Sequence, residues 1–261
     1  MSTLADRTIA ALRSEHDTLT AVVAPLTDDQ LTGPSGASAW TIADVLSHLG
    51  SGAEITAAGV EGATGGEAPD DGFNQSVWDR WNAMSPRAQA DGFVAGNAAL
   101  TGRFEAFDAE QHENLRLAVG FGPGPLTVAT FAGLRLDEVA LHAWDVRVGV
   151  DSAAVLDDTT ATVLLEQFAG DLGFLLGFIG KPDQLAEPVV VDIEGTGFAL
   201  VVGDGVAVTT GATEATATLT GGADAAIRLL TGRLGADHTP AAVGVTGATT
   251  LDALRAAFPG F

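Results

Sequence analysis

The chain has 261 residues, of which 46% are apolar and 18% are charged, a composition typical of a folded globular protein with a sizeable core rather than of a disordered chain. The formal net charge of -22 argues against the basic surface that binding to nucleic acid or to an anionic membrane requires. The absence of cysteine excludes disulfides, thiolate metal ligands and a thiol nucleophile of the protein's own, so any thiol chemistry must use a small-molecule thiol.

The first 150 residues predict a helical domain. Four segments have the apolar spacing of helices: residues 4–23, a stretch that begins after Trp40, residues 73–107, and a stretch from Thr127 or Thr130 to about Arg147. Thr41 and Asp44 match a capping box at the start of the second segment, and a break in the third is expected near Pro86 or Gly92. Two Gly-rich connections, a loop and a stiff turn, are expected at residues 59–72 and 120–125. Four consecutive helices predict a bundle.

Residues 151–261 predict a smaller domain that contains strands. A helix at residues 159–179 is followed by short segments of alternating apolar residues, which predict strands at 188–193, 198–202, 206–210 and 215–220. Gly203 to Gly205 predicts a hairpin turn between two of them. Helical spacing returns at residues 223–230 and 251–258. The predicted fold class is therefore α+β, with a four-helix bundle at residues 1–150 and an α+β domain at residues 151–261.

No targeting or membrane segment is recognisable. The first 17 residues carry charges of both signs among their apolar residues, so they lack the core of a signal peptide. The most apolar stretch, Phe174 to Ile179, is far shorter than the about 20 residues that cross a bilayer. We expect a cytoplasmic protein.

Three residues form a candidate metal site. Glu138 and His142 are four residues apart, so they project from one face of their helix, close to leucines. His48 lies among apolar residues of the second predicted helix and would also face inward. If the two helices are neighbours, two imidazoles and a carboxylate converge and leave a coordination position open, as in catalytic zinc sites and in non-haem iron(II) sites. Spacing alone favours a core histidine and an ordinary surface pair, since such pairs are common.

Two segments around these residues resemble a known family. Trp40-Thr-Ile-Ala-Asp-Val-Leu-Ser-His-Leu49 and Asp137-Glu-Val-Ala-Leu-His-Ala-Trp-Asp-Val146 resemble the second-helix and fourth-helix signatures of the mycothiol-dependent maleylpyruvate isomerase family. The resemblance implies a DinB-like four-helix bundle that binds a divalent metal, usually zinc, through one histidine and a glutamate–histidine pair. These ligands correspond to His48, Glu138 and His142. Asp44 and Asp145 are candidates for the acceptors that orient the two histidines.

The resemblance extends into the second half of the chain. Residues 221–234 and the ending Leu251-Asp-Ala-Leu-Arg-Ala-Ala-Phe258 are similar to the sterol-carrier-like C-terminal domain of that family. Arg233 is a candidate catalytic residue because a guanidinium group binds a carboxylate with two hydrogen bonds, and Arg80 is a candidate cofactor-binding residue. An ordinary surface arginine is the alternative for both. His16, His112 and His238 lack ligand-like spacing and are expected at the surface or at helix ends.

The family resemblance implies an enzyme whose cofactors are a divalent metal, expected to be Zn²⁺, and mycothiol. A metal-bound thiol loses its proton at neutral pH and could add to a small electrophile, either in an isomerisation or in the broader thiol-transfer reaction, which we favour. The expected partners are therefore a low-molecular-weight thiol and a small-molecule electrophile. One alternative is a non-catalytic metal-containing protein that binds an apolar ligand in its C-terminal domain, and another is an iron oxygenase that uses the same three residues.

Overall fold

The computed structural model describes residues 2–119 and 122–260. The chain divides into two units, the first ending at Ala154 and the second beginning at Val155. In this part of the chain no single helix is long and apolar enough to cross a bilayer. Two consecutive helical segments, Asp158–Ala169 and Asp171–Ile179, reach the length and apolar composition of a membrane span only when they are taken together. They are bent by 78° relative to each other.

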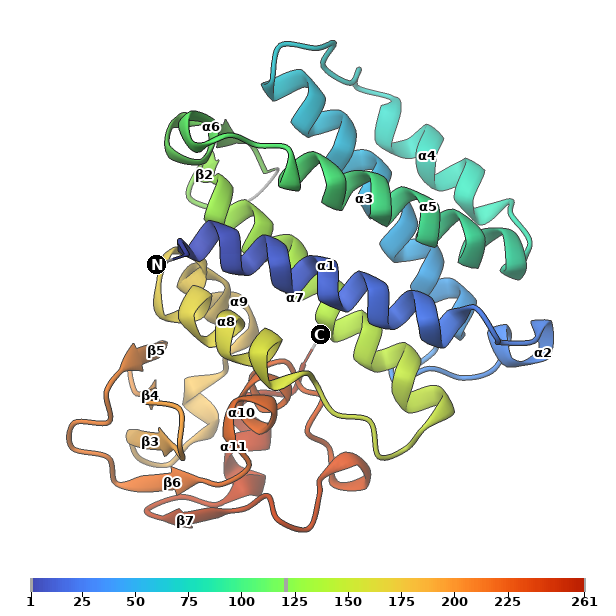
Figure 1. Cartoon of the computed structure of the whole chain (residues 1–261). Helices are drawn as coiled ribbons and strands as arrows, with labels where there is room; N and C mark the ends of the chain where they lie inside the picture. The colour runs from blue at the N-terminus through green and yellow to red at the C-terminus, as the bar shows by residue number, and fades with distance from the viewer. Residues whose placement is uncertain (1, 120–121, 261) are drawn as a thin grey trace. The chain divides into compact units, whose positions relative to one another are not determined.

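Four long helices build the first unit: α1 (Leu4–Val23), α3 (Ile42–Ala63), α5 (Pro86–Glu105) and α7 (Val128–Val150). Both α1 and α3 pack against α5 and against α7, so the four helices close into a bundle (Figure 1). Side chains that are completely buried fill its centre, among them Leu12, Leu46, Leu49, Phe93, Leu100, Leu136 and Val139. The predicted bundle is confirmed, and α3 and α7 are neighbours in it.

Shorter elements connect the bundle helices. They are α2 (Asp28–Leu31), α4 (Phe73–Asn82), α6 (Ala109–Asn114), β1 (Arg116–Leu117) and β2 (Leu126–Thr127). The strands β1 and β2 pair antiparallel just before α7, and α4 packs on the outside of α3 (Figure 1).

The helix ends differ in part from the sequence predictions. The second predicted helix runs to Ala63, beyond the predicted loop start at Gly59, because Val60 is buried and its packing offsets the cost of a helical glycine. The third segment breaks at Pro86, not at Gly92, and Ser85 caps the new helix. The turn predicted at residues 120–125 begins with two residues that lie outside the described ones.

A five-stranded sheet forms the centre of the second unit. Its strands are β3 (Val189–Ile193), β4 (Phe198–Val202), β5 (Val206–Thr210), β6 (Ala217–Leu219) and β7 (Val245–Gly247). They are arranged in the order β5-β4-β3-β6-β7. The β3–β6 pair is parallel and the other three pairs are antiparallel. The predicted hairpin joins β4 and β5, whereas the sequence did not indicate β7.

Helices complete the second unit. They are α8 (Asp158–Ala169), α9 (Leu176–Ile179), α10 (Gly222–Leu230) and α11 (Leu251–Ala257). Three short 3₁₀ helices accompany them: η1 (Asp171–Leu175), η2 (Pro182–Gln184) and η3 (Ala236–His238). The helix α10 packs on β3, β6 and α8. The single helix predicted at 159–179 is wrong, because Gly170 adopts a non-helical backbone (φ -110°, ψ -141°) and bends the chain. The predicted α+β class is confirmed.

Candidate metal centre

The first ligand candidate, His48, lies in α3, whose start is fixed by a capping box. The Thr41 hydroxyl accepts a hydrogen bond from the Asp44 backbone N–H, and the Asp44 carboxylate accepts one from the Thr41 backbone N–H. This start sets the rotation of α3, so that Leu49 is completely buried while the His48 side chain is 41% exposed. Asp44 therefore caps the start of α3, and its carboxylate is hydrogen-bonded to Thr41 rather than to the imidazole of His48.

The other two candidates, Glu138 and His142, lie one turn apart on α7. Thr127 caps this helix by accepting a hydrogen bond from the backbone N–H of Thr130. The Glu138 side chain is 44% exposed and the His142 side chain is 16% exposed. The site is therefore more open than the apolar neighbours of these residues in the sequence predict, because this end of the α3–α7 interface faces a pocket instead of the bundle core.

The three side chains converge across the α3–α7 interface. His48 Nε2 lies 3.0 Å from Glu138 Oε2, and His142 Nε2 lies 3.9 Å from the same oxygen. One potential ligand atom from each residue lies within 4.8 Å of the other two. Two ligands of a tetrahedral zinc ion are about 3.4 Å apart, given bond lengths of about 2.1 Å. Two imidazole nitrogens and one carboxylate oxygen at these separations fit a divalent metal after small side-chain rotations.

Charged neighbours keep the Glu138 carboxyl group ionised. Burial opposes ionisation, but the hydrogen bond with His48 and the charges of His142, His48 and Arg135 outweigh it and lower the pKa of Glu138 to about 2. Glu138 thus has, at neutral pH, the deprotonated form that a metal ligand needs.

A buried carboxylate orients His142. Asp145, whose side chain is only 1% exposed, places Oδ2 2.8 Å from His142 Nδ1. An ionised carboxylate accepts this hydrogen bond, so the proton of the neutral imidazole resides on Nδ1 and the lone pair on Nε2, which faces Glu138. Histidine ligands of metals commonly have such an arrangement.

Aromatic rings border the triad. The Trp40 ring lies 5.9 Å from the His142 ring in a stacked arrangement and 5.2 Å from the His48 ring. Trp78 is exposed and lines the cavities beside His48. Trp81 and Trp144, in contrast, are buried.

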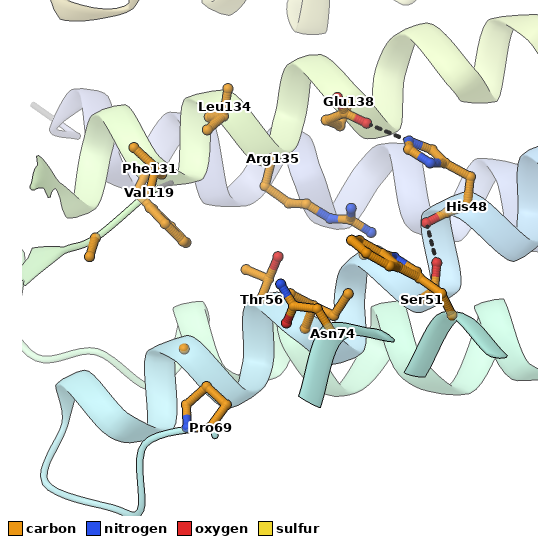
Figure 2. A pocket seen from close by; sticks show the side chains of 15 residues that line it. His48, Ser51, Thr56, Pro69, Asn74, Val119, Phe131, Leu134, Arg135 and Glu138 are labelled. Atoms are coloured by element: carbon orange, nitrogen blue, oxygen red, sulfur yellow. Dashed lines mark hydrogen bonds and ion pairs between the residues drawn. The ribbon is translucent and has the colours of Figure 1, made fainter. Parts of the chain in front are cut away.

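His48 borders two cavities of the first unit. A cavity of about 480 Å³ extends along α3 and α7 past Glu138, with Ile55, Phe131 and Leu134 among its apolar walls (Figure 2). A second cavity of about 370 Å³ lies toward Asp44, with Ser47 and Asn82 also in its wall. Figure 2 shows the imidazole of His48 pointing toward the Glu138 carboxylate at one end of the larger cavity.

The larger cavity contains Arg135, a residue that the sequence analysis missed. Arg135 lies one turn before Glu138 on α7, and its side chain projects into the space between Glu138 and Thr56 (Figure 2). It is 6% exposed. An arginine at the helical spacing of the buried residues Ala132 and Val139 was the available signal, because a charge inside a bundle needs a partner.

The two arginines singled out from the sequence are Arg80 of α4 and Arg233 of the second unit. Arg80 pairs with Glu54, which also accepts a hydrogen bond from the Trp81 indole N–H. Arg80 is half exposed and is not among the residues that line the two cavities. Arg233 belongs to the second unit and donates a hydrogen bond to the Thr231 carbonyl oxygen.

The surface location expected for His16 is wrong. His16 is 4% exposed and its Nδ1 lies 3.1 Å from Nδ2 of the buried Asn97. Its position on the core-facing side of α1 gives it that location. His112 lies at the end of the short helix α6, 3.6 Å from Asp6, and His238 lies in η3.

The sequence of this chain is similar to that of a known family and of mycobacterial proteins. Residues 12–147 match the family described as "Mycothiol maleylpyruvate isomerase N-terminal domain". One uncharacterized protein of Mycobacterium tuberculosis is 29% identical over 179 residues, which cover 67% of this chain and 84% of the relative. A second one is 29% identical over 204 residues, which cover 72% of each chain.

Solved structures share the fold of the whole chain. Crystal structures of the mycothiol-dependent maleylpyruvate isomerase, unmodified and as a point mutant, superpose with a TM-score of 0.66 at 15% sequence identity. The match covers 100% of this chain and 100% of the other.

Proposed function

The chain belongs to the mycothiol maleylpyruvate isomerase family, and on that premise we propose that it is a metal-dependent enzyme that uses mycothiol to act on a small electrophile. The observation that carries the proposal is the convergence of His48, Glu138 and His142 beside two cavities, both of which His48 lines. Such a site has room for two small molecules next to one metal ion. The chain has no cysteine, so the thiol must come from one of them.

His48, Glu138 and His142 would hold the metal, which we propose is zinc because zinc favours this mixture of imidazole and carboxylate ligands in a tetrahedral site. When bound, the metal would supply the positive charge that lowers the pKa of a thiol so that it reacts as a thiolate at neutral pH. Asp145 keeps the lone pair of His142 on Nε2. The apolar walls of the larger cavity would hold the electrophile and exclude water from it.

The proposed reaction begins with addition of the thiolate sulfur to the β-carbon of a double bond conjugated to a carbonyl group. The electron pair of the double bond moves to the carbonyl oxygen, and the former double bond can rotate. Loss of the same thiolate returns the electron pair and gives the isomerised alkene, so that the thiol is regenerated. Protonation of the adduct instead gives the thiol-transfer product. No oxidant or reductant is consumed in either outcome.

Elemental analysis of protein purified without added metal, followed by titration with mycothiol, tests the proposal. We expect about one divalent metal per chain and saturable mycothiol binding that disappears when a chelator removes the metal. His142→Ala should lose both, and His238→Ala, which changes a histidine of the second unit, should lose neither. Turnover of an activated alkene by metal-free protein would refute the proposal. Binding of apolar ligands without thiol binding or turnover would favour the non-catalytic alternative.

A further inference from the structure

Trp40 packs against both histidines of the triad. The centre of its ring lies 5.2 Å from that of His48 and 5.9 Å from that of His142, and the two imidazole rings are 4.8 Å apart. All three separations fall in the range in which aromatic rings attract each other. Trp40 is nevertheless 39% exposed, so burial in the bundle core does not explain why a tryptophan occupies this position.

The two histidines differ in what orients their rings. Asp145 fixes the His142 ring at Nδ1. His48 Nε2 is hydrogen-bonded to Glu138, but His48 Nδ1 has no hydrogen-bond partner among the described residues. Histidines that bind a metal usually have an acceptor at their other ring nitrogen, and this acceptor sets the orientation of the ring. The rings of Trp40 and His142 are in a position to orient His48 instead.

A strained turn places the indole ring. The Trp40 backbone N–H donates to the Ala37 carbonyl oxygen at 3.0 Å and so closes a β-turn that has Ala39 at its third position. Ala39 has a φ of 73°, a value that suits glycine, and it is one of two non-glycine residues with positive φ among the described ones. A left-handed backbone at a residue with a side chain costs free energy and often marks a functional site. Here the strained residue directly precedes Trp40.

The segment that carries Trp40, residues 33–41, is attached to α7. The Trp40 carbonyl oxygen accepts hydrogen bonds from the Ser35 backbone N–H at 3.1 Å and from Ser35 Oγ at 2.8 Å. The Gly36 backbone N–H donates to the Asp145 carbonyl oxygen at 2.7 Å. Gly36 lies so close to α7 that a Cβ atom would be 3.0 Å from Asp145 Cα. The segment therefore connects the indole to the residue that orients the other histidine.

We propose that Trp40 is a positioning residue of the metal site, whose indole ring holds the His48 imidazole with Nε2 facing the other two ligands. The left-handed Ala39 fixes the indole in turn. The inference rests on the proposed function in one respect: the triad is taken to bind a divalent metal. A side chain that is already oriented loses less freedom on binding, so removal of the indole should weaken metal binding. Trp40 itself does not contact the metal in this role.

The first measurement is the affinity of the full-length protein for Zn²⁺, in competition with a chromogenic chelator. Trp40→Leu should lower it by about tenfold to a hundredfold, the range for removing a group that orients a metal ligand. Trp40→Phe keeps an aromatic ring beside the histidines and should retain most of the affinity. Phe178→Leu, which removes an exposed aromatic ring of the second unit, should have the affinity of the wild type. Circular dichroism shows whether each variant is folded.

Substitutions in the turn test Ala39 while Trp40 is unchanged. Ala39→Gly suits the positive φ and should keep the affinity for Zn²⁺, whereas Ala39→Val puts a β-branched residue there and should lower it. Ser38→Val is the matched control, because Ser38 is an exposed residue of the same turn and its φ is not positive. It should leave the affinity unchanged. Wild-type affinity in Ala39→Val would contradict the role of the turn.

The second measurement is made on protein without metal. Three-bond couplings in nuclear magnetic resonance spectra report the χ1 rotamer of each histidine. His48 should have one rotamer in the wild type and in Trp40→Phe, and should average over several in Trp40→Leu. The buried His16 and the hydrogen-bonded His142 should keep their rotamers in all three proteins. A general loss of structure would change the couplings of all three histidines.

The outcomes separate the inference from the proposed function. Wild-type Zn²⁺ affinity or an unchanged His48 rotamer in Trp40→Leu would overturn the inference, and metal binding by the wild type would still support the proposed function. A wild-type protein that binds no metal would overturn the proposed function. In that case, loss of the single His48 rotamer in Trp40→Leu would still support positioning by the indole, and its retention would refute it.

Discussion

Asp145 Oδ2 lies 2.8 Å from His142 Nδ1, whereas the other ring nitrogen, Nε2, lies 3.9 Å from Glu138 Oε2. Asp145 is almost completely buried and sits three residues after His142 on the same helix. The imidazole is therefore fixed at one nitrogen and presents the other to the centre of the triad. A small change at Asp145 should alter metal affinity without touching any of the three candidate ligands.

We predict that Asp145→Asn lowers metal affinity by about 10-fold to 100-fold, the usual effect of removing such an acceptor. The amide is a weaker acceptor than the carboxylate and can present its NH₂ group to His142 instead. Competition with a chromogenic chelator measures the affinity. Asp44→Asn is the matched control, because Asp44 bonds to Thr41 and not to His48. Equal losses in the two variants would contradict the prediction.

Two glycines of α3 should respond oppositely to alanine. A Cβ atom at Gly50 would overlap the ring of Trp81, whereas one at Gly59 would meet nothing within 4 Å. Gly50→Ala should destabilise the protein by about 1–3 kcal/mol, the cost of overpacking. Gly59→Ala should stabilise it by about 0.4–1 kcal/mol, because alanine has less freedom in the unfolded chain. Denaturant midpoints test both, and a stabilised Gly50→Ala would contradict the packing around Trp81.

Stability should decrease as the pH falls below the ordinary histidine value of 6.5. Burial lowers the pKa of His16 in the folded state, so between that lowered value and 6.5 the unfolded chain binds more protons than the folded one. The contribution of neutral His16 is thus complete above pH 6.5 and is lost toward lower pH. Urea midpoints at pH 7.5 and 5.5 measure it, and His16→Gln should show a smaller difference between the two values. Identical differences would argue against His16 as the cause.

A two-bond ion pair between α1 and α5 should contribute only modestly. Arg13 Nε and Nη2 donate to the two Glu105 carboxylate oxygens, each at 2.8 Å, but both side chains are partly exposed. A double-mutant cycle with Arg13→Met and Glu105→Gln should give a coupling of about 0.5 kcal/mol at low salt, which decreases at high salt.

The same ion pair predicts a second, pH-dependent result. The hydrogen bond from Arg13 lowers the pKa of Glu105, so the coupling should be present at neutral pH and be lost as the pH falls below the ordinary value of 4.5. Measurement of the cycle at pH 7 and at pH 3 checks this. A coupling that persists unchanged at pH 3 would assign it to packing of the aliphatic side chains instead.

The sequence by itself determined the elements with strong local signals. Apolar spacing and capping residues placed α1 at its observed bounds and α3 at its observed start, and they gave the observed cap of α7, Thr127, as one of two candidates. Alternation placed four of the five strands in the larger sheet. The backbone of Gly170 and the extension of α3 beyond Gly59 were not predictable, because a glycine permits several conformations and packing selects among them. Strand β7 pairs only along the edge of β6, and its sequence has little apolar character.

Sequence similarity also singled out His48, Glu138 and His142, but only the tertiary structure brought His48 to 3.0 Å from Glu138, 90 residues away. The packing of α3 against α7 decided that distance, and it also placed His48 beside two cavities and Glu138 beside the larger one. Arg135 and its connection through Asn97 to His16 could be found only in the folded chain. The physical reason is that helical spacing shows which residues share a face, whereas the neighbouring helices decide what that face meets.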